Sequence, residues 1–94
     1  MCSLYRRNPK RDTNEAIVVE ALRRCGFSVI HLSIRGCGDL LLGKDGITRV
    51  AEVKGLKEDL NDEQQAWWES WRGNPLMILR SIEDVAYLAK WWSR

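Results

Sequence analysis

The sequence predicts a mixed α/β domain in which a central sheet is flanked by helices. Apolar residues at helical spacing near the N-terminus predict a first helix, and short β-branched and apolar runs in the middle of the chain predict strands. Two later segments begin with residues that commonly cap helices. The expected order is helix, three strands, helix, strand, helix, which is typical of helices packed on one sheet.

The first helix is expected to begin near Asp12, because Glu15 follows it at capping-box spacing, and to end at Gly26. Its apolar positions share one helical face: Val18, Ala21, Leu22 and Cys25. Residues 1–11 carry several arginines and lysines and are expected to form a basic N-terminal arm. This arm either contacts phosphate or is simply solvated, and residues 12–94 form the single domain.

The next residues predict three strands. Residues 27–34 are rich in β-branched and aromatic side chains and form the first strand, which the segment 35–38 breaks. Residues 39–42 form the second strand and residues 47–54 the third. Asp45–Gly46 between them favours a tight hairpin, because this pair readily adopts positive φ angles.

The last third of the chain predicts two helices around a short strand. After a loop at residues 55–60, Asn61 caps a helix that runs to about Arg72. Residues 76–79 form the strand, and Ser81 caps a final helix over residues 82–92. Five tryptophans lie in or beside these helices: Trp67, Trp68, Trp71, Trp91 and Trp92. We expect most of them in the core or at an interface, with base stacking as the minor alternative.

The composition bounds the class of protein. A chain of 94 residues with 45% hydrophobic residues is expected to form one folded domain, and its net charge of +2 favours no class of partner. It has no signal-type segment and no apolar run long enough to span a membrane. The three cysteines, Cys2, Cys25 and Cys37, lack zinc-site spacing. We therefore expect a soluble, cytoplasmic protein with reduced thiols.

Three charged residues interrupt the apolar strands. Asp39 opens the second strand, and Glu52 and Lys54 lie two apart in the third. Side chains alternate along a strand, so Glu52 and Lys54 point the same way. Asp39 and Glu52 lie at similar distances from the predicted hairpin turn, so their carboxylates are expected to meet at one end of the sheet.

Two carboxylates held together repel each other unless a cation lies between them, and oxygen ligands select a hard cation such as Mg²⁺. Mg²⁺ can polarise a phosphodiester and generate hydroxide, and Lys54 could hold the attacking water or offset charge on the phosphorus. The alternative is an ordinary charged pair, Glu52 and Lys54, on a wet strand face, with Asp39 as a turn residue. The apolar context and the hairpin favour the metal site.

Three other polar residues are candidates of different weight. Glu15 lies on the inward stripe of the first helix and is either a helix cap or a ligand of metal or water. Gln64, near the start of the second helix, could reach a phosphate or position water. His31 is the only histidine and lacks an obvious partner, so we expect a packed or edge residue rather than a catalytic one.

Residues 35–43 resemble the Gly-x-Pro-Asp motif of VRR-NUC-type nucleases in the PD-(D/E)XK superfamily, and residues 50–55 resemble their Glu-x-Lys motif. Residues 60–64, followed by tryptophans, resemble the glutamine-bearing helix of that family, and Asn14–Glu15 resembles its first-helix acid. The resemblance runs from about Lys10 to the C-terminus. One departure is Gly38, where the family usually has proline; glycine loosens the start of a strand that proline would stiffen.

The resemblance implies a restriction endonuclease-like core, dependence on Mg²⁺ or Mn²⁺, and often a homodimer acting on branched DNA such as Holliday junctions. Stand-alone domains of this size are typical of bacteriophages and bacteria. The implied active-site residues are Asp39, Glu52, Lys54, Gln64 and Glu15. The implied metal ligands are Asp39, Glu52 and the backbone carbonyl of Val53, with Glu15 as a further candidate.

Three functions stay open on the sequence. The first is a structure-selective DNA endonuclease, and the second is a degenerate nuclease fold that binds DNA or a protein without cutting. The third is an interaction protein whose tryptophans bind another protein. Retention of Asp39, Glu52 and Lys54 together favours the first, and a divalent-cation titration separates it from the other two.

Overall fold

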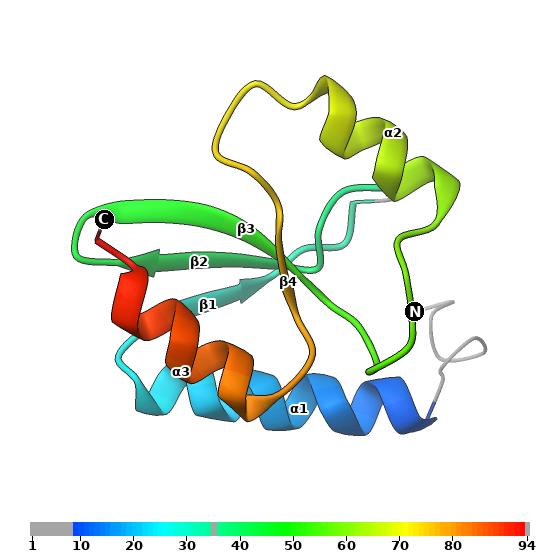
Figure 1. Ribbon diagram of the computed structural model, residues 1–94. Helices are drawn as coiled ribbons and strands as arrows, with labels where there is room; N and C mark the ends of the chain where they lie inside the picture. Colours follow the sequence, from blue (N-terminus) through cyan, green and yellow to red (C-terminus); the bar gives the residue numbers. More distant parts are fainter. Residues whose placement is uncertain (1–8, 35, 94) are drawn as a thin grey trace.

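The computed structural model describes residues 9–34 and 36–93 as one sheet with three helices (Figure 1). In chain order the elements are α1 (Pro9–Arg24), β1 (Ser28–His31), β2 (Leu40–Lys44), β3 (Ile47–Val53), α2 (Asp62–Ser70), β4 (Met77–Leu79) and α3 (Ile82–Trp91). This order confirms the predicted mixed α/β fold.

The sheet has the strand order β1-β2-β3-β4. The first three strands are antiparallel neighbours, and β4 pairs parallel with β3 after the chain has passed through α2. The β2–β3 turn is the predicted hairpin, with φ of 55° at Asp45 and 77° at Gly46. The pairing of Leu40 with Ala51 fixes the register that positions the charged residues at the far end of the hairpin.

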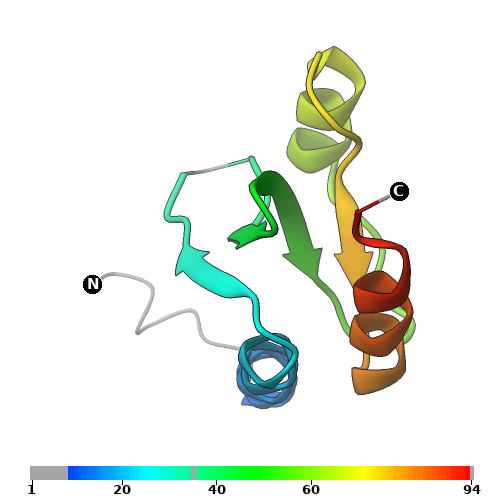
Figure 2. The same ribbon diagram turned by 90° about the vertical axis from the view of Figure 1, so that its left-hand side faces the viewer.

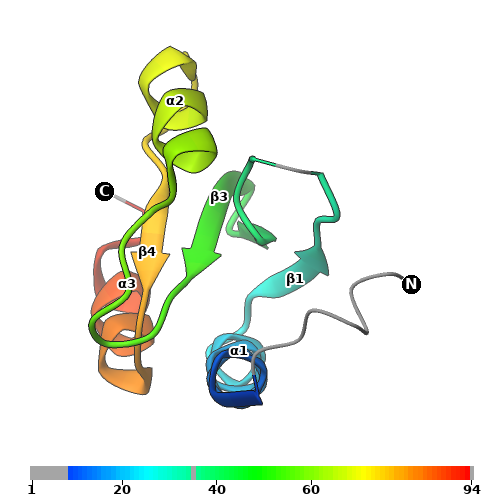
Figure 3. The ribbon, with the colours of Figure 1, turned by 90° about the vertical axis from the view of Figure 1, so that its right-hand side faces the viewer.

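One face of the sheet carries the core. Figures 2 and 3 show α1 and α3 together on one side of the strands, with α2 away from them. The core residues are Val18, Val19 and Leu22 from α1, Phe27, Leu40 and Leu42, Ala51 and Val53 from β3, Leu79, and Val85, Leu88 and Trp92 at the C-terminus. Alternation along β3 puts Glu52, between Ala51 and Val53, on the opposite face.

Some element boundaries differ from the prediction. The first helix begins at Pro9, so Asp12 lies inside it rather than at its cap; proline suits a first helical turn because its missing N–H needs no partner there. Residues 1–8 of the predicted basic arm lie outside the described residues. The first strand stops at His31 rather than Ile34, because the register with β2 ends at the pair His31–Leu40. Beyond it the Leu32 N–H still donates to the Asp39 carbonyl at 2.7 Å, and Ile34 is 67% exposed.

The aromatic load is divided between the core and the surface. Trp92 is buried edge-to-face against Phe27, with ring centroids 4.8 Å apart. Trp67 and Trp71 stack on each other at 4.9 Å, and Trp71 and Trp91 are exposed. The described helices include none with the length and apolar character needed to cross a membrane.

Candidate active site

Asp39 and Glu52 come together at the end of the β2–β3 hairpin. Continuing the register by one residue beyond Leu40–Ala51 sets Asp39 opposite Glu52, with both side chains on one face. The Asp39 Oδ2 atom accepts a hydrogen bond of 3.0 Å from the Val53 backbone N–H. The β2–β3 register therefore agrees with the prediction that the two carboxylates lie close together at one end of the sheet.

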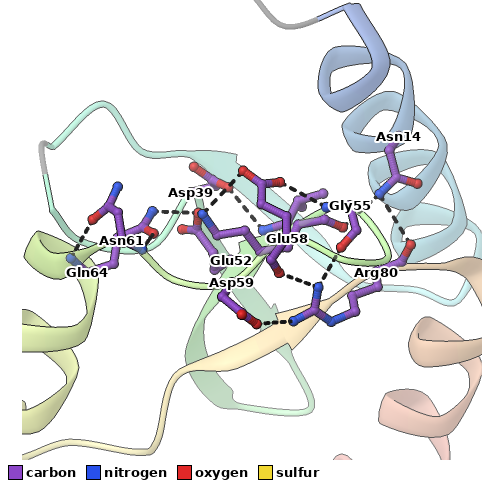
Figure 4. A network of polar contacts seen from close by, with 11 residues as sticks. Asn14, Asp39, Glu52, Gly55, Glu58, Asp59, Asn61, Gln64 and Arg80 are labelled. Carbon is purple, nitrogen blue, oxygen red and sulfur yellow. Dashed lines mark hydrogen bonds and ion pairs between the residues drawn. The ribbon is translucent and has the colours of Figure 1, made fainter.

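Glu52 is a fully buried carboxylate whose polar neighbours include Gln64 and Lys54. Its Oε2 atom accepts a hydrogen bond of 2.7 Å from the Gln64 side-chain amide and lies 3.4 Å from the Lys54 ammonium (Figure 4). A buried carboxylate is costly unless hydrogen bonds and an opposite charge compensate it. Gln64 and Lys54 supply both, and the contact between Lys54 and Glu52 confirms that the two side chains share a face.

Gln64 links the start of α2 to this carboxylate. Its side-chain oxygen accepts from the Asn61 backbone N–H at 3.0 Å, and the Asn61 side chain accepts from the Gln64 N–H at 2.9 Å. This reciprocal pair is a capping box, which fixes the side chain of its third helical residue. With its side-chain oxygen used in the capping box, Gln64 directs its side-chain NH₂ group at Glu52.

The loop after β3 is held in place by residues to which the sequence analysis gave no role in the site. The Arg80 guanidinium donates to the backbone carbonyls of Gly55 and Glu58, and the Glu58 carboxylate lies 3.6 Å from the Lys54 ammonium. Asn14 in α1 donates its amide to the Lys54 and Arg80 carbonyls, at 3.0 and 3.2 Å. No periodicity or turn signal marks Asn14 or Arg80, because each contacts a segment distant in the sequence.

Glu15 faces another neighbour. Its carboxylate lies 3.3 Å from the His31 ring nitrogen, beside an open cleft between α1 and β1. This contact gives His31 the partner that the sequence did not show, and it places His31 at the end of β1. Asn14, the preceding residue of α1, donates to the Lys54 carbonyl, whereas the role of Glu15 as a ligand stays a prediction.

The Cys37 thiol lies near both carboxylates, because the charges of Glu52 and Asp39 both affect its pKa. Burial raises the pKa of the Cys37 thiol, and the negative charges of Glu52 and Asp39 raise it further. Both charges disfavour the thiolate, so Cys37 is a poor nucleophile and a poor metal ligand at neutral pH. The same field would attract a cation to this end of the hairpin.

The donors at this end fit a hard divalent cation. Asp39 and Glu52 supply carboxylate oxygens. Because a strand residue directs its N–H and C=O to the same side, the Val53 carbonyl is expected on the Asp39 side of β3. Within the described part of the chain, no three His, Cys, Asp or Glu side chains are grouped to hold a metal. The set of two carboxylates and a carbonyl suits Mg²⁺, which keeps several waters when bound to proteins.

Gly38 occupies a tight position just before Asp39. A Cβ atom there would lie 2.5 Å from Val50 Cγ1, 2.8 Å from the Ala51 carbonyl oxygen and 3.0 Å from Leu76 Cδ1. Glycine at this position is therefore required by close packing, which gives a steric reason for the departure from the proline of the motif.

Comparison with known proteins identifies the fold. The chain is similar to a solved VRR_NUC domain, with a TM-score of 0.73 and 24% sequence identity over 86% of this chain and 95% of that one. No family model matches the sequence. No curated protein matches it either. The chain therefore has a VRR-NUC-type, restriction endonuclease-like fold.

Proposed function

We propose that this protein is a divalent-metal-dependent DNA endonuclease that hydrolyses phosphodiester bonds. The observation that carries the proposal is the convergence of Asp39, Glu52 and Lys54 at one end of the β2–β3 hairpin, within a VRR-NUC-type fold. A structural ion pair between Glu52 and Lys54 would not by itself explain why the Asp39 carboxylate lies at the same end of the hairpin.

In this proposal Asp39, Glu52 and the Val53 carbonyl hold Mg²⁺ or Mn²⁺, which when bound polarises the phosphodiester and activates water. Lys54 orients the attacking water or stabilises the charge that develops on the phosphoryl oxygens. Gln64 keeps the Glu52 carboxylate in place through its hydrogen bond of 2.7 Å. Glu15, whose carboxylate lies 3.3 Å from the His31 ring nitrogen, is a further candidate ligand in this proposal.

A cleavage assay tests the proposal. Linear, nicked, flapped and four-way DNA would each be incubated with Mg²⁺, Mn²⁺ or EDTA, using the wild type and Lys54→Met. We expect products only with the divalent cations and only from the wild type. Retention of DNA without cleavage under every condition would instead support a non-cutting binding module and refute the enzyme.

We further propose that the substrate is branched DNA and that the enzyme acts as a homodimer. One active centre cuts one strand, whereas resolving a four-way junction needs two symmetric cuts, which a twofold dimer provides. Exposed aromatics are available as interface anchors, because Trp71, Trp91 and Tyr87 are 45%, 41% and 68% exposed. Light scattering should give twice the chain mass, and a monomer would favour nicking or end processing over junction resolution.

A further inference from the structure

The Lys54 ammonium lies between two carboxylates rather than in one ion pair. Its Nζ atom is 3.4 Å from Glu52 Oε2 and 3.6 Å from Glu58 Oε2, and its side chain is only 3% exposed. Figure 4 shows the Glu52 and Glu58 carboxylates within this network of polar contacts. Both distances exceed those of tight charge-assisted hydrogen bonds. The ammonium is therefore shared between two anions, and it keeps donors for a third partner such as water or phosphate oxygen.

Glu58 is itself held in place. The turn that carries it is closed by the Glu58 N–H donating to the Gly55 carbonyl at 3.2 Å, and Glu58 Oε1 accepts from the Gly55 N–H at 3.0 Å. The Arg80 guanidinium donates to the Gly55 and Glu58 carbonyls from the other side. Because these contacts already hold Glu58, little further conformational entropy is lost when it keeps its contact with Lys54 while Lys54 changes its other contacts.

The two carboxylates have different prospects when a divalent cation binds. Glu52 belongs to the candidate ligand set, so the cation would neutralise its charge and at the same time repel the ammonium. Glu58 belongs to the loop after β3, where its other carboxylate oxygen accepts from the Gly55 N–H, and it is not in that set. An anion in this position can retain Lys54 after Glu52 is engaged.

We propose that Glu58 is a positioning residue that holds the Lys54 ammonium at the active centre when a divalent cation occupies Asp39 and Glu52. The inference rests on the proposed metal-dependent function and adds to it a second carboxylate that acts only through Lys54. It predicts that the contribution of Glu58 is small without metal, when Glu52 also holds Lys54, and large with metal.

Lysine reactivity measures this directly and without any substrate. The wild type, Glu58→Gln and Asp59→Asn would be acetylated with and without Mg²⁺, and modification of Lys54 quantified by mass spectrometry against the exposed Lys57. Glu58→Gln keeps an acceptor for the Gly55 N–H but removes the charge. Asp59→Asn removes the same charge from the same loop at a side chain that is 95% exposed.

We expect Lys54 to stay protected in the wild type and in Asp59→Asn under both conditions. In Glu58→Gln it should stay protected without Mg²⁺ and react about fivefold faster or more with it. In the cleavage assay, Glu58→Gln should lower kcat by about tenfold with KM little changed, because the loss falls on the chemical step. A purely structural Glu58 would leave the Mg²⁺ dependence of labelling unchanged.

The failures of the two proposals are distinguishable. If the wild type binds Mg²⁺ by calorimetry and cuts DNA, but Glu58→Gln labels and cuts like the wild type, the role of Glu58 is overturned and the enzyme stands. A wild type that neither binds Mg²⁺ nor cuts overturns the proposed function, and this inference with it. Should Glu58→Gln fail to fold by circular dichroism, Glu58→Asp gives the same comparison, since its carboxylate is withdrawn by one methylene.

Discussion

Gly38→Ala should destabilise the protein far more than its size suggests. The added methyl group would lie 2.5 Å from Val50 Cγ1 and 2.8 Å from the Ala51 carbonyl oxygen, both closer than real Cβ contacts allow. Val50 can give way by a small rotation, whereas the carbonyl is part of the β3 backbone and cannot move without disturbing the ladder. Asp39 follows directly, so any shift also displaces the candidate ligand.

The expected cost follows from overpacking, which typically destabilises by about 1–3 kcal/mol. The backbone contact places Gly38→Ala in the upper part of that range, at about 2–3 kcal/mol. In a domain of this length such a change lowers Tm by roughly 10–20 °C. The cleavage rate should fall as well, because Asp39 would lose its alignment with the Val53 N–H.

Urea unfolding and thermal melts measure the effect, and Gly43→Ala is the matched control. Gly43 lies in β2 and has a negative φ; its added Cβ would meet only Ser28 Cβ at an ordinary 3.9 Å. The double variant Gly38→Ala/Val50→Ala should be about 1 kcal/mol more stable than the sum of the two single effects, because Val50→Ala removes one of the clashes. Gly38→Ala as stable as Gly43→Ala would refute the steric reasoning.

Three other predictions concern the polar cluster. Lys54→Met should abolish cleavage and lower the free energy of unfolding by about 3 kcal/mol, because it leaves Glu52 buried without its cation; urea melts and calorimetry with Mg²⁺ check both. Gln64→Glu keeps the capping box but sets a second carboxylate against Glu52, so at pH 8 it should lower the free energy of unfolding by about 2 kcal/mol. Binding of Mg²⁺ at the site should restore this stability. Because the pKa of Cys37 is raised in the folded protein, its contribution to the free energy of unfolding is fully present below the ordinary thiol pKa and should be lost as pH rises through the folded pKa. At neutral pH iodoacetamide should modify Cys37 more slowly than the exposed Cys25, and Asp39→Asn should increase the rate at Cys37.

The candidate active site lies at the end of the two central strands of a small sheet. The core fills one face, where α1 and α3 pack, while the opposite face carries Glu52. The polar residues there are stabilised by one another rather than by apolar packing, so changes in one are expected to be felt by the others. Such a network holds a reactive geometry only while its members stay paired.

The sequence by itself determined what depends on short-range rules. Strand alternation put Glu52 and Lys54 on one face, and the Asp45–Gly46 turn fixed the register that sets Asp39 opposite Glu52. Capping residues located the starts of α2 and α3, as the Asn61 and Ser81 contacts confirm. These relations are set within a few residues along the chain, which is why a pattern predicts them.

Only the tertiary structure decided how separate elements meet. The Asn14 amide contacts carbonyls 40 and 66 positions away, Arg80 closes a loop 22 and 25 positions earlier, and Gly38 fits beneath Val50 and Leu76. The contact of Glu58 with Lys54 spans only four residues, but Arg80 from beyond β4 helps to hold the loop that makes it. The contact of Glu15 with His31 depends on how α1 lies against β1. No local periodicity encodes such contacts, because they follow from close packing of whole elements, whose relative placement is fixed by the core they share.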